Sequence, residues 1–61
     1  MERVIEILME RDDLTREQAQ RWVEECIVQM EEVNYDPVES ENILMEFLGL
    51  EPDYLIDILT F

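Results

Sequence analysis

The sequence predicts an all-α fold: a small bundle of three principal helices with a short fourth helix at the C-terminal end. In residues 14–34, apolar side chains recur at alternating steps of three and four, which places them on one stripe of an α-helix. Pro37 and Pro52 stand where helices would begin, and Gly49 stands where one would end. Because the chain has 61 residues, we expect a single domain covering residues 1–61.

The first predicted helix covers about residues 2–11. Met1, Val4, Ile5 and Leu8 form its inner stripe. The aspartate pair at residues 12–13 ends it, because aspartate competes with the helix by bonding to nearby backbone groups. We therefore expect a short amphipathic helix whose apolar side packs against the longer helix that follows it.

The second predicted helix covers about residues 16–33 and organises the rest of the chain. Thr15, with Gln18 three residues later, matches a capping box, in which each side chain accepts a hydrogen bond from the other residue's backbone N–H. The inner stripe holds the only tryptophan and the only cysteine of the chain and consists of Ala19, Trp22, Val23, Cys26, Ile27, Met30 and Val33. We expect this stripe to supply the largest share of the core.

The third predicted helix covers about residues 37–48. Asp36 is its expected N-cap, Pro37 takes its first position, and Glu39 completes a second capping box. Gly49 follows the last residue and can adopt the left-handed conformation that commonly ends a helix. The apolar residues of this helix cover more than one stripe: Val38, Leu44, Met45, Phe47 and Leu48.

The last predicted helix covers about residues 52–60 and is apolar on almost all sides. Asp57 is the only charged residue after Asp53, whereas a surface helix of a monomer normally keeps a polar face. We therefore expect this helix to contact a second copy of the chain, which makes a homodimer the predicted assembly. The candidate self-association residues are Tyr54, Ile56, Ile58 and Phe61.

Two stretches of the sequence carry a family resemblance. The runs LTREQAQRWVEEC and NYDPVESENILMEFLGLEPDYLIDIL resemble small acidic helical proteins encoded by phages and prophages of Gram-positive bacteria. The resemblance covers roughly residues 14–59, and its most distinctive part is the ending LGLEPDYL, in which Gly49 and Pro52 fix two helix boundaries. It implies an accessory protein of phage or mobile-element origin, without implying a particular activity. Residues 1–13 lie outside it.

The charge of the chain is strongly negative and unevenly placed. The formal net charge is −13, and the four basic residues are all arginines within residues 1–21. Residues 22–61 contain eleven acidic residues and no basic one. Charge of this density repels DNA, RNA and anionic lipid, so we expect neither direct nucleic-acid binding nor membrane binding. The candidate partner-binding residues form an expected acidic face: Glu24, Glu25, Glu31, Glu32, Glu39, Glu41 and Glu46.

The composition argues against chemistry carried by the chain itself. There is no histidine and only one cysteine, so an intramolecular disulfide is impossible and neither a structural zinc site nor a bound cofactor is expected. Cys26 has no histidine to activate it and is flanked by acids, so we expect a buried structural thiol and no enzyme activity. No apolar run is long enough to cross a bilayer, and the acidic N-terminal stretch does not resemble a signal peptide, so a location in the bacterial cytoplasm is expected.

Two functional hypotheses from different classes remain open. In the first, the chain is a phage or prophage accessory protein that binds a protein partner stoichiometrically. Its acidic face would then imitate the phosphates of nucleic acid and occupy the basic groove of a host nucleic-acid-binding or defence protein. In the second, the chain is a small structural homo-oligomer whose surface charge only keeps it in solution.

Overall fold

The computed structural model describes residues 2–59 and confirms the all-α class over that range. The helices in chain order are α1 (Glu2–Arg11), α2 (Arg16–Glu32), α3 (Pro37–Ile43), the π-helix η1 (Leu44–Leu48), the 3-10 helix η2 (Pro52–Tyr54) and α4 (Leu55–Leu59). The bounds of α1 and α2 lie within one residue of those expected. The predicted helix at 37–48 becomes α3 and η1, and the one at 52–60 becomes η2 and α4.

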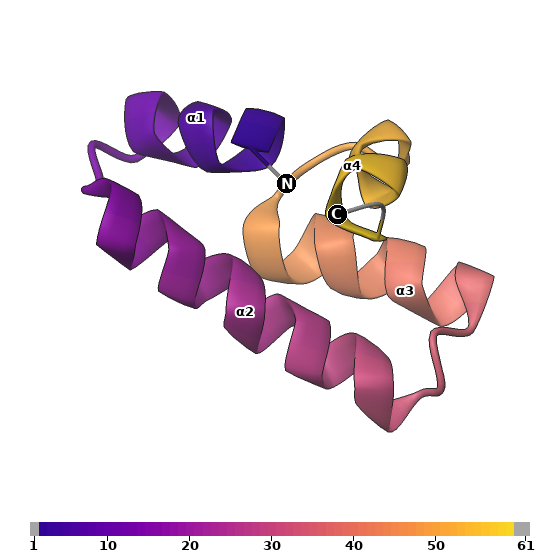
Figure 1. Cartoon of the computed structure of the whole chain (residues 1–61). Coiled ribbons are helices and arrows are strands. Elements are labelled where there is room, and N and C mark those ends of the chain that lie inside the picture. Colours follow the sequence, from indigo (N-terminus) through magenta and orange to yellow (C-terminus); the bar gives the residue numbers. More distant parts are fainter. Residues whose placement is uncertain (1, 60–61) are drawn as a thin grey trace.

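The longest helix, α2, lies along one side of the molecule and holds the others together. Figure 1 shows α1 beside its first half, while α3 and η1 lie beside its second half. The helix α4 packs against α1, so the two ends of the described chain meet. The Cα atoms fill an envelope of 29 × 21 × 18 Å.

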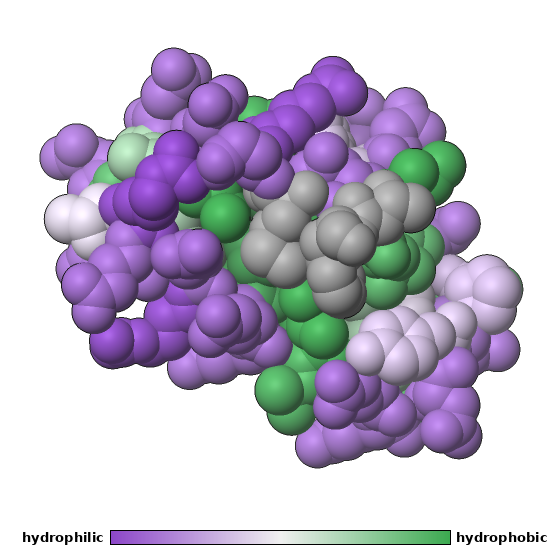
Figure 2. Space-filling view, viewed as in Figure 1, coloured by the Kyte–Doolittle hydropathy of each residue, from purple (hydrophilic) through white to green (hydrophobic). Residues whose placement is uncertain are grey.

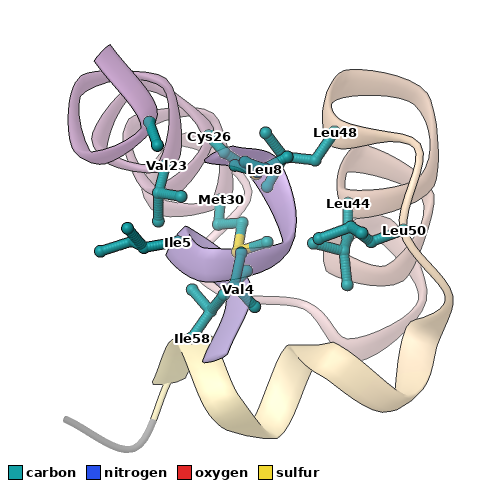
Figure 3. Packing of buried hydrophobic residues seen from close by; sticks show 11 residues of the cluster. Val4, Ile5, Leu8, Val23, Cys26, Met30, Leu44, Leu48, Leu50 and Ile58 are labelled. Carbon is teal, nitrogen blue, oxygen red and sulfur yellow. The ribbon is translucent and has the colours of Figure 1, made fainter. Parts of the chain in front are cut away.

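One hydrophobic core lies between these helices. Its buried members come from every α-helix except α3, from η1 and from the loop after η1: Val4, Ile5, Leu8, Ala19, Val23, Cys26, Met30, Leu44, Leu48, Leu50 and Ile58. Figure 3 shows that their side chains point into the space enclosed by the helices. Trp22 and Ile27, expected in the inner stripe of α2, are half-buried and pack against the edge of this cluster.

The helix ends follow the local signals in the sequence, except that the second expected capping box lacks the bond from the Glu39 side chain back to Asp36. Thr15 Oγ accepts a hydrogen bond from the Gln18 N–H at 3.1 Å, and Gln18 Oε1 accepts one from the Thr15 N–H at 3.0 Å, so the capping box is complete. Asp36 Oδ2 accepts from the Glu39 N–H at 3.1 Å at the start of α3. Gly49 has a φ of 68° and ends η1 in the left-handed region.

The π-helix η1 departs from the single α-helix expected at 37–48. Ser40, Leu44 and Leu48, spaced by four, are all buried. In η1 the hydrogen bonds run from residue i to residue i+5, so the turn is wider than in the α-helix α3 that precedes it. The apolar residues expected on more than one stripe do not all face the core, since Val38 and Met45 are exposed.

The helix α4 is docked on α1 by its own side chains. Asp57 Oδ2 accepts a hydrogen bond from the Val4 N–H at 3.2 Å, in the first turn of α1, where the helix dipole favours a carboxylate. The Arg3 guanidinium lies 5.1 Å from the centre of the Tyr54 ring. Ile58 is fully buried in the core. The prediction that Ile58 lies on a self-association surface is therefore wrong, because this side chain closes the core of its own chain.

Candidate functional site

The expected acidic face lies on one continuous stretch of helices, α2, α3 and η1. Six of its seven glutamates are exposed, and the seventh, Glu41, is half-buried. Four of them lie on the second half of α2, at residues 24, 25, 31 and 32. Glu39 and Glu41 lie on α3, and Glu46 lies on η1.

Val28 is at the centre of the four glutamates on α2. It is 51% exposed, because it lies on the side of α2 that faces away from the buried stripe. Glu24 and Glu32 lie four residues from it, and Glu25 and Glu31 lie three residues from it, so all four are its neighbours on the helix surface. Averaged over residues 24–32, this face carries about one negative charge per 3.4 Å of helix axis, which is close to the charge spacing of one DNA strand.

Tyr35 holds one of these glutamates from the turn between α2 and α3. Its hydroxyl donates a hydrogen bond to Glu31 Oε1 at 3.2 Å. Desolvation, this hydrogen bond and the charge of Glu31 all raise the pKa of the Tyr35 phenol, so it remains a neutral donor. The Tyr35 backbone has a φ of 56°, a left-handed conformation that a tyrosine rarely adopts.

Two of the four arginines contact backbone or aromatic groups far from the acidic face. Arg3 lies over the Tyr54 ring, as described above. Arg11 donates hydrogen bonds to the carbonyl oxygens of Leu48 at 2.7 Å and Gly49 at 3.3 Å, at the C-terminal end of η1. A cation is favoured there because the last carbonyls of a helix carry partial negative charge. These two arginines therefore join α1 to the second half of the chain.

The other two arginines pair with acids outside the acidic face. Arg16 forms a two-pronged ion pair with the carboxylate of Glu2, and Arg21 lies 3.5 Å from a carboxylate oxygen of Glu17, one turn earlier in α2. Within residues 2–59, no arginine therefore contacts any of the seven glutamates of the acidic face. Among residues 2–59 their negative charge is therefore left to solvent and dissolved ions, apart from the hydrogen bond that the Tyr35 hydroxyl donates to Glu31.

A hollow opens between α2 and η1, beside the acidic face. It is lined by Gln29, Ile43, Glu46 and Phe47 and has a volume of about 320 Å³. Ile43 and Phe47 are half-buried, whereas Gln29 and Glu46 are exposed. The sequence analysis did not identify this site except for Glu46, because the hollow depends on how η1 packs beside α2.

The expected self-association residues do not all lie together on the surface. Ile56 is 72% exposed, Tyr54 is half-buried beneath Arg3, and Ile58 is buried. Phe61 lies outside the described residues. Figure 2 shows that hydrophobic surface gathers in the centre of the face seen in Figure 1, from the end of α4 towards α2, with hydrophilic surface around it.

Two other kinds of site were sought in the described part of the chain. Among residues 2–59, no helix is both long enough and apolar enough to cross a membrane. In the same residues, no group of three or more histidine, cysteine, aspartate or glutamate side chains is close enough together to hold a metal ion. Comparison with protein-family models, curated proteins and solved structures found no match to this chain.

Cys26 is fully buried in the core, as its place on the α2 stripe predicted. Burial raises the pKa of its thiol from 9.0 to about 11. Below pH 9 the thiol is protonated in both the folded and the unfolded chain. Between about pH 9 and 11 it ionises mainly in the unfolded chain, so stability falls as the pH rises through this window.

We therefore expect the urea midpoint of unfolding to fall between pH 8 and pH 10, in part because of Cys26. The Cys26→Ala variant is the matched control, since its other titrating groups, including Tyr35, are unchanged. Its midpoint should fall less than that of the wild type over the same interval. Equal falls in the two proteins would show that the Cys26 thiol does not contribute to the pH dependence.

Proposed function

We propose that this chain acts by stoichiometric binding to a protein partner that has a basic groove. The observation that carries the proposal is the placement of the arginines, all four of which are engaged away from the acidic face. A salt-bridged acidic surface needs no partner, whereas these glutamates are exposed and have no cationic partner in the described chain. A basic groove would supply the missing countercharge and steer the association.

The partner class we favour is a nucleic-acid-binding or defence protein of a bacterial host. Such a protein presents Lys and Arg side chains spaced to meet phosphates, and the axial charge spacing of α2 is close to that of one DNA strand. The resemblance of residues 14–59 to small acidic phage and prophage proteins agrees with this role. The protein would then act in the host cytoplasm as an acidic mimic that inhibits its target.

The experiment is a pull-down from a Gram-positive bacterial lysate at 50 mM and 500 mM sodium chloride. We expect a basic nucleic-acid-binding protein that is captured at the lower salt concentration and lost at the higher one, because ions screen exposed charges. Duplex DNA added in excess should displace the chain from the captured protein, since both would occupy one groove. If the captured protein stays bound at the higher salt concentration and in excess duplex DNA, the proposal is contradicted.

Two double variants distinguish the effect of the acidic face on binding from the effect of net charge alone. The double substitution Glu24→Gln with Glu25→Gln removes two acids from the face, and Glu6→Gln with Glu10→Gln removes two exposed acids from α1. Both variants have the same net charge. We expect the first to weaken binding to the captured protein by about five- to tenfold, at roughly 0.5–0.7 kcal/mol for each exposed charge, and the second by less than about twofold.

The competing function is a structural homo-oligomer without an inhibitory role. The observation that favours it is the high exposure of Ile56 on α4. A homodimer formed through this face of α4 would bury Ile56 and leave the acidic face of each copy open. Self-association of this kind is also compatible with the binding function, so the oligomeric state alone does not decide between them.

A further inference from the structure

The hollow between α2 and η1 combines apolar, aromatic, amide and carboxylate groups in a small space. Ile43 and Phe47 form its apolar part, and Gln29 and Glu46 supply polar groups at its exposed side. Its volume of about 320 Å³ is at the lower limit of small-molecule ligand sites, which span about 300–1,000 Å³. A hollow of this size suits one long side chain better than a cofactor.

The end of α3 and η1 form one wall of the hollow. Ile43 is the last residue of α3, and Phe47 follows four residues later in η1. Residues four apart lie on nearly the same side of a helix, so Ile43 and Phe47 both line the hollow, while Leu44 and Leu48 are buried in the core. The wall of the hollow opposite Gln29 is therefore a continuous apolar surface, and Glu46 stands beside it.

The electrostatic surroundings of the hollow favour a cation. Glu46 lines it directly, and Glu25 and Glu32 lie four and three residues from Gln29, on the neighbouring surface of α2. Neither Glu25, Glu32 nor Glu46 has an arginine partner in residues 2–59. An uncharged apolar side chain would remove water from Glu46 without replacing its hydrogen bonds, which is unfavourable.

We propose that this hollow is a socket for one arginine side chain of the protein partner. The inference rests on the proposed function and adds the point of recognition within the acidic face. The aliphatic stem of the arginine packs against Ile43 and Phe47, and the guanidinium donates hydrogen bonds to the Glu46 carboxylate and the Gln29 side-chain carbonyl. Arginine is favoured over lysine because its planar, weakly hydrated cation stacks on an aromatic ring and bonds a carboxylate with two donors.

The test is a nuclear magnetic resonance titration of the ¹⁵N-labelled full chain with three blocked tripeptides, Gly-Arg-Gly, Gly-Lys-Gly and Gly-citrulline-Gly. The arginine peptide should shift the amide signals of residues 29, 43, 46 and 47 in a saturable way. The lysine peptide should bind at least about threefold more weakly, and the citrulline peptide, which has the same shape without the charge, should leave these signals unchanged. Absence of the arginine shifts, or binding of the lysine or citrulline peptide as tight as that of the arginine peptide, would overturn the proposal.

Two single variants distinguish specific binding in the socket from general attraction of the peptide to the acidic face. Glu46→Gln removes the carboxylate in the hollow, and Glu24→Gln removes an equally exposed carboxylate elsewhere on the acidic face. We expect Glu46→Gln to weaken binding of the arginine peptide by about fivefold and Glu24→Gln by less than about twofold. Phe47→Leu should also weaken it, by about threefold, because the aromatic face is lost while the apolar bulk remains.

The outcome also distinguishes this proposal from the proposed function. Equal effects of Glu46→Gln and Glu24→Gln would overturn the socket, even if a basic partner is captured from lysate through the acidic face as a whole. Saturable binding of the arginine peptide that depends on Glu46 would support the socket even if the lysate yields no partner. Circular dichroism of each variant verifies that its helices are intact before binding is measured.

Discussion

Replacing Leu8 with alanine should leave the chain largely unfolded at 25 °C. Leu8 is fully buried, and Figure 3 shows its side chain directed from α1 into the core, between α2 and η1. Truncating a buried leucine to alanine costs about 2–5 kcal/mol, through lost burial and the cavity that remains. A single core in a domain of this size supplies only about 3–5 kcal/mol, so one such cavity removes most of the stability.

The measurement is circular dichroism with urea titration, compared with the variant Val38→Ala. Val38 is 65% exposed on α3, so the same kind of truncation there should change stability by no more than about 0.5 kcal/mol. A cooperative Leu8→Ala transition close to that of the wild type would mean that α1 contributes little to the core. Residues 14–59 would then fold without it.

The parts of the fold that the sequence predicted well are those with local causes. Thr15 and Gln18 form two hydrogen bonds with each other across three residues. Gly49 adopts the left-handed conformation because it has no side chain to oppose it. Such signals need no knowledge of distant residues, because the donor and the acceptor are fixed by the helix itself. The apolar stripes of α1 and α2 are local in the same sense, since their spacing alone identifies the buried side.

The parts that the sequence did not predict depend on contacts between distant segments. Asp57 looked like a single polar interruption in an apolar helix, but it is the carboxylate that bonds the Val4 N–H in the first turn of α1. Arg11 bonds the carbonyls that end η1, 37 and 38 residues away in sequence. The hollow beside Phe47 depends on how η1 packs beside α2, which no local pattern in the sequence indicates.

The acidic face shows the same division between local and tertiary information. Its glutamates could be identified from composition and exposed helix positions, and the structure leaves six of the seven exposed. What composition could not show is that every arginine is engaged elsewhere: Arg3 and Arg11 contact η2 and the end of η1, Arg16 joins α2 to Glu2 of α1, and Arg21 pairs with Glu17 within α2. The basic residues serve the fold, so the acidic surface remains without an internal countercharge.

Two isoleucines of α4 should respond in opposite ways to the same substitution. Ile58 is fully buried, whereas Ile56 is 72% exposed two residues earlier. Both were predicted to lie on one self-association surface because the helix expected at residues 52–60 is apolar on almost all sides, so its pattern does not identify a single buried side. The structure separates them, since only Ile58 points into the core of its own chain.

Ile58→Glu should therefore unfold the chain or detach α4, because a buried carboxylate without a partner costs several kcal/mol, comparable to the whole stability of the domain. Ile56→Glu should retain the wild-type helix content, since its side chain stays in solvent. Circular dichroism and the reactivity of Cys26 towards a thiol reagent report the fold, and sedimentation velocity reports the assembly.

If Ile56 forms a homodimer contact, Ile56→Glu gives a folded monomer where the wild type gives a dimer. A wild type that is already monomeric at high micromolar concentration would exclude that contact, and an unfolded Ile56→Glu would mean that α4 packs on the core through a different face.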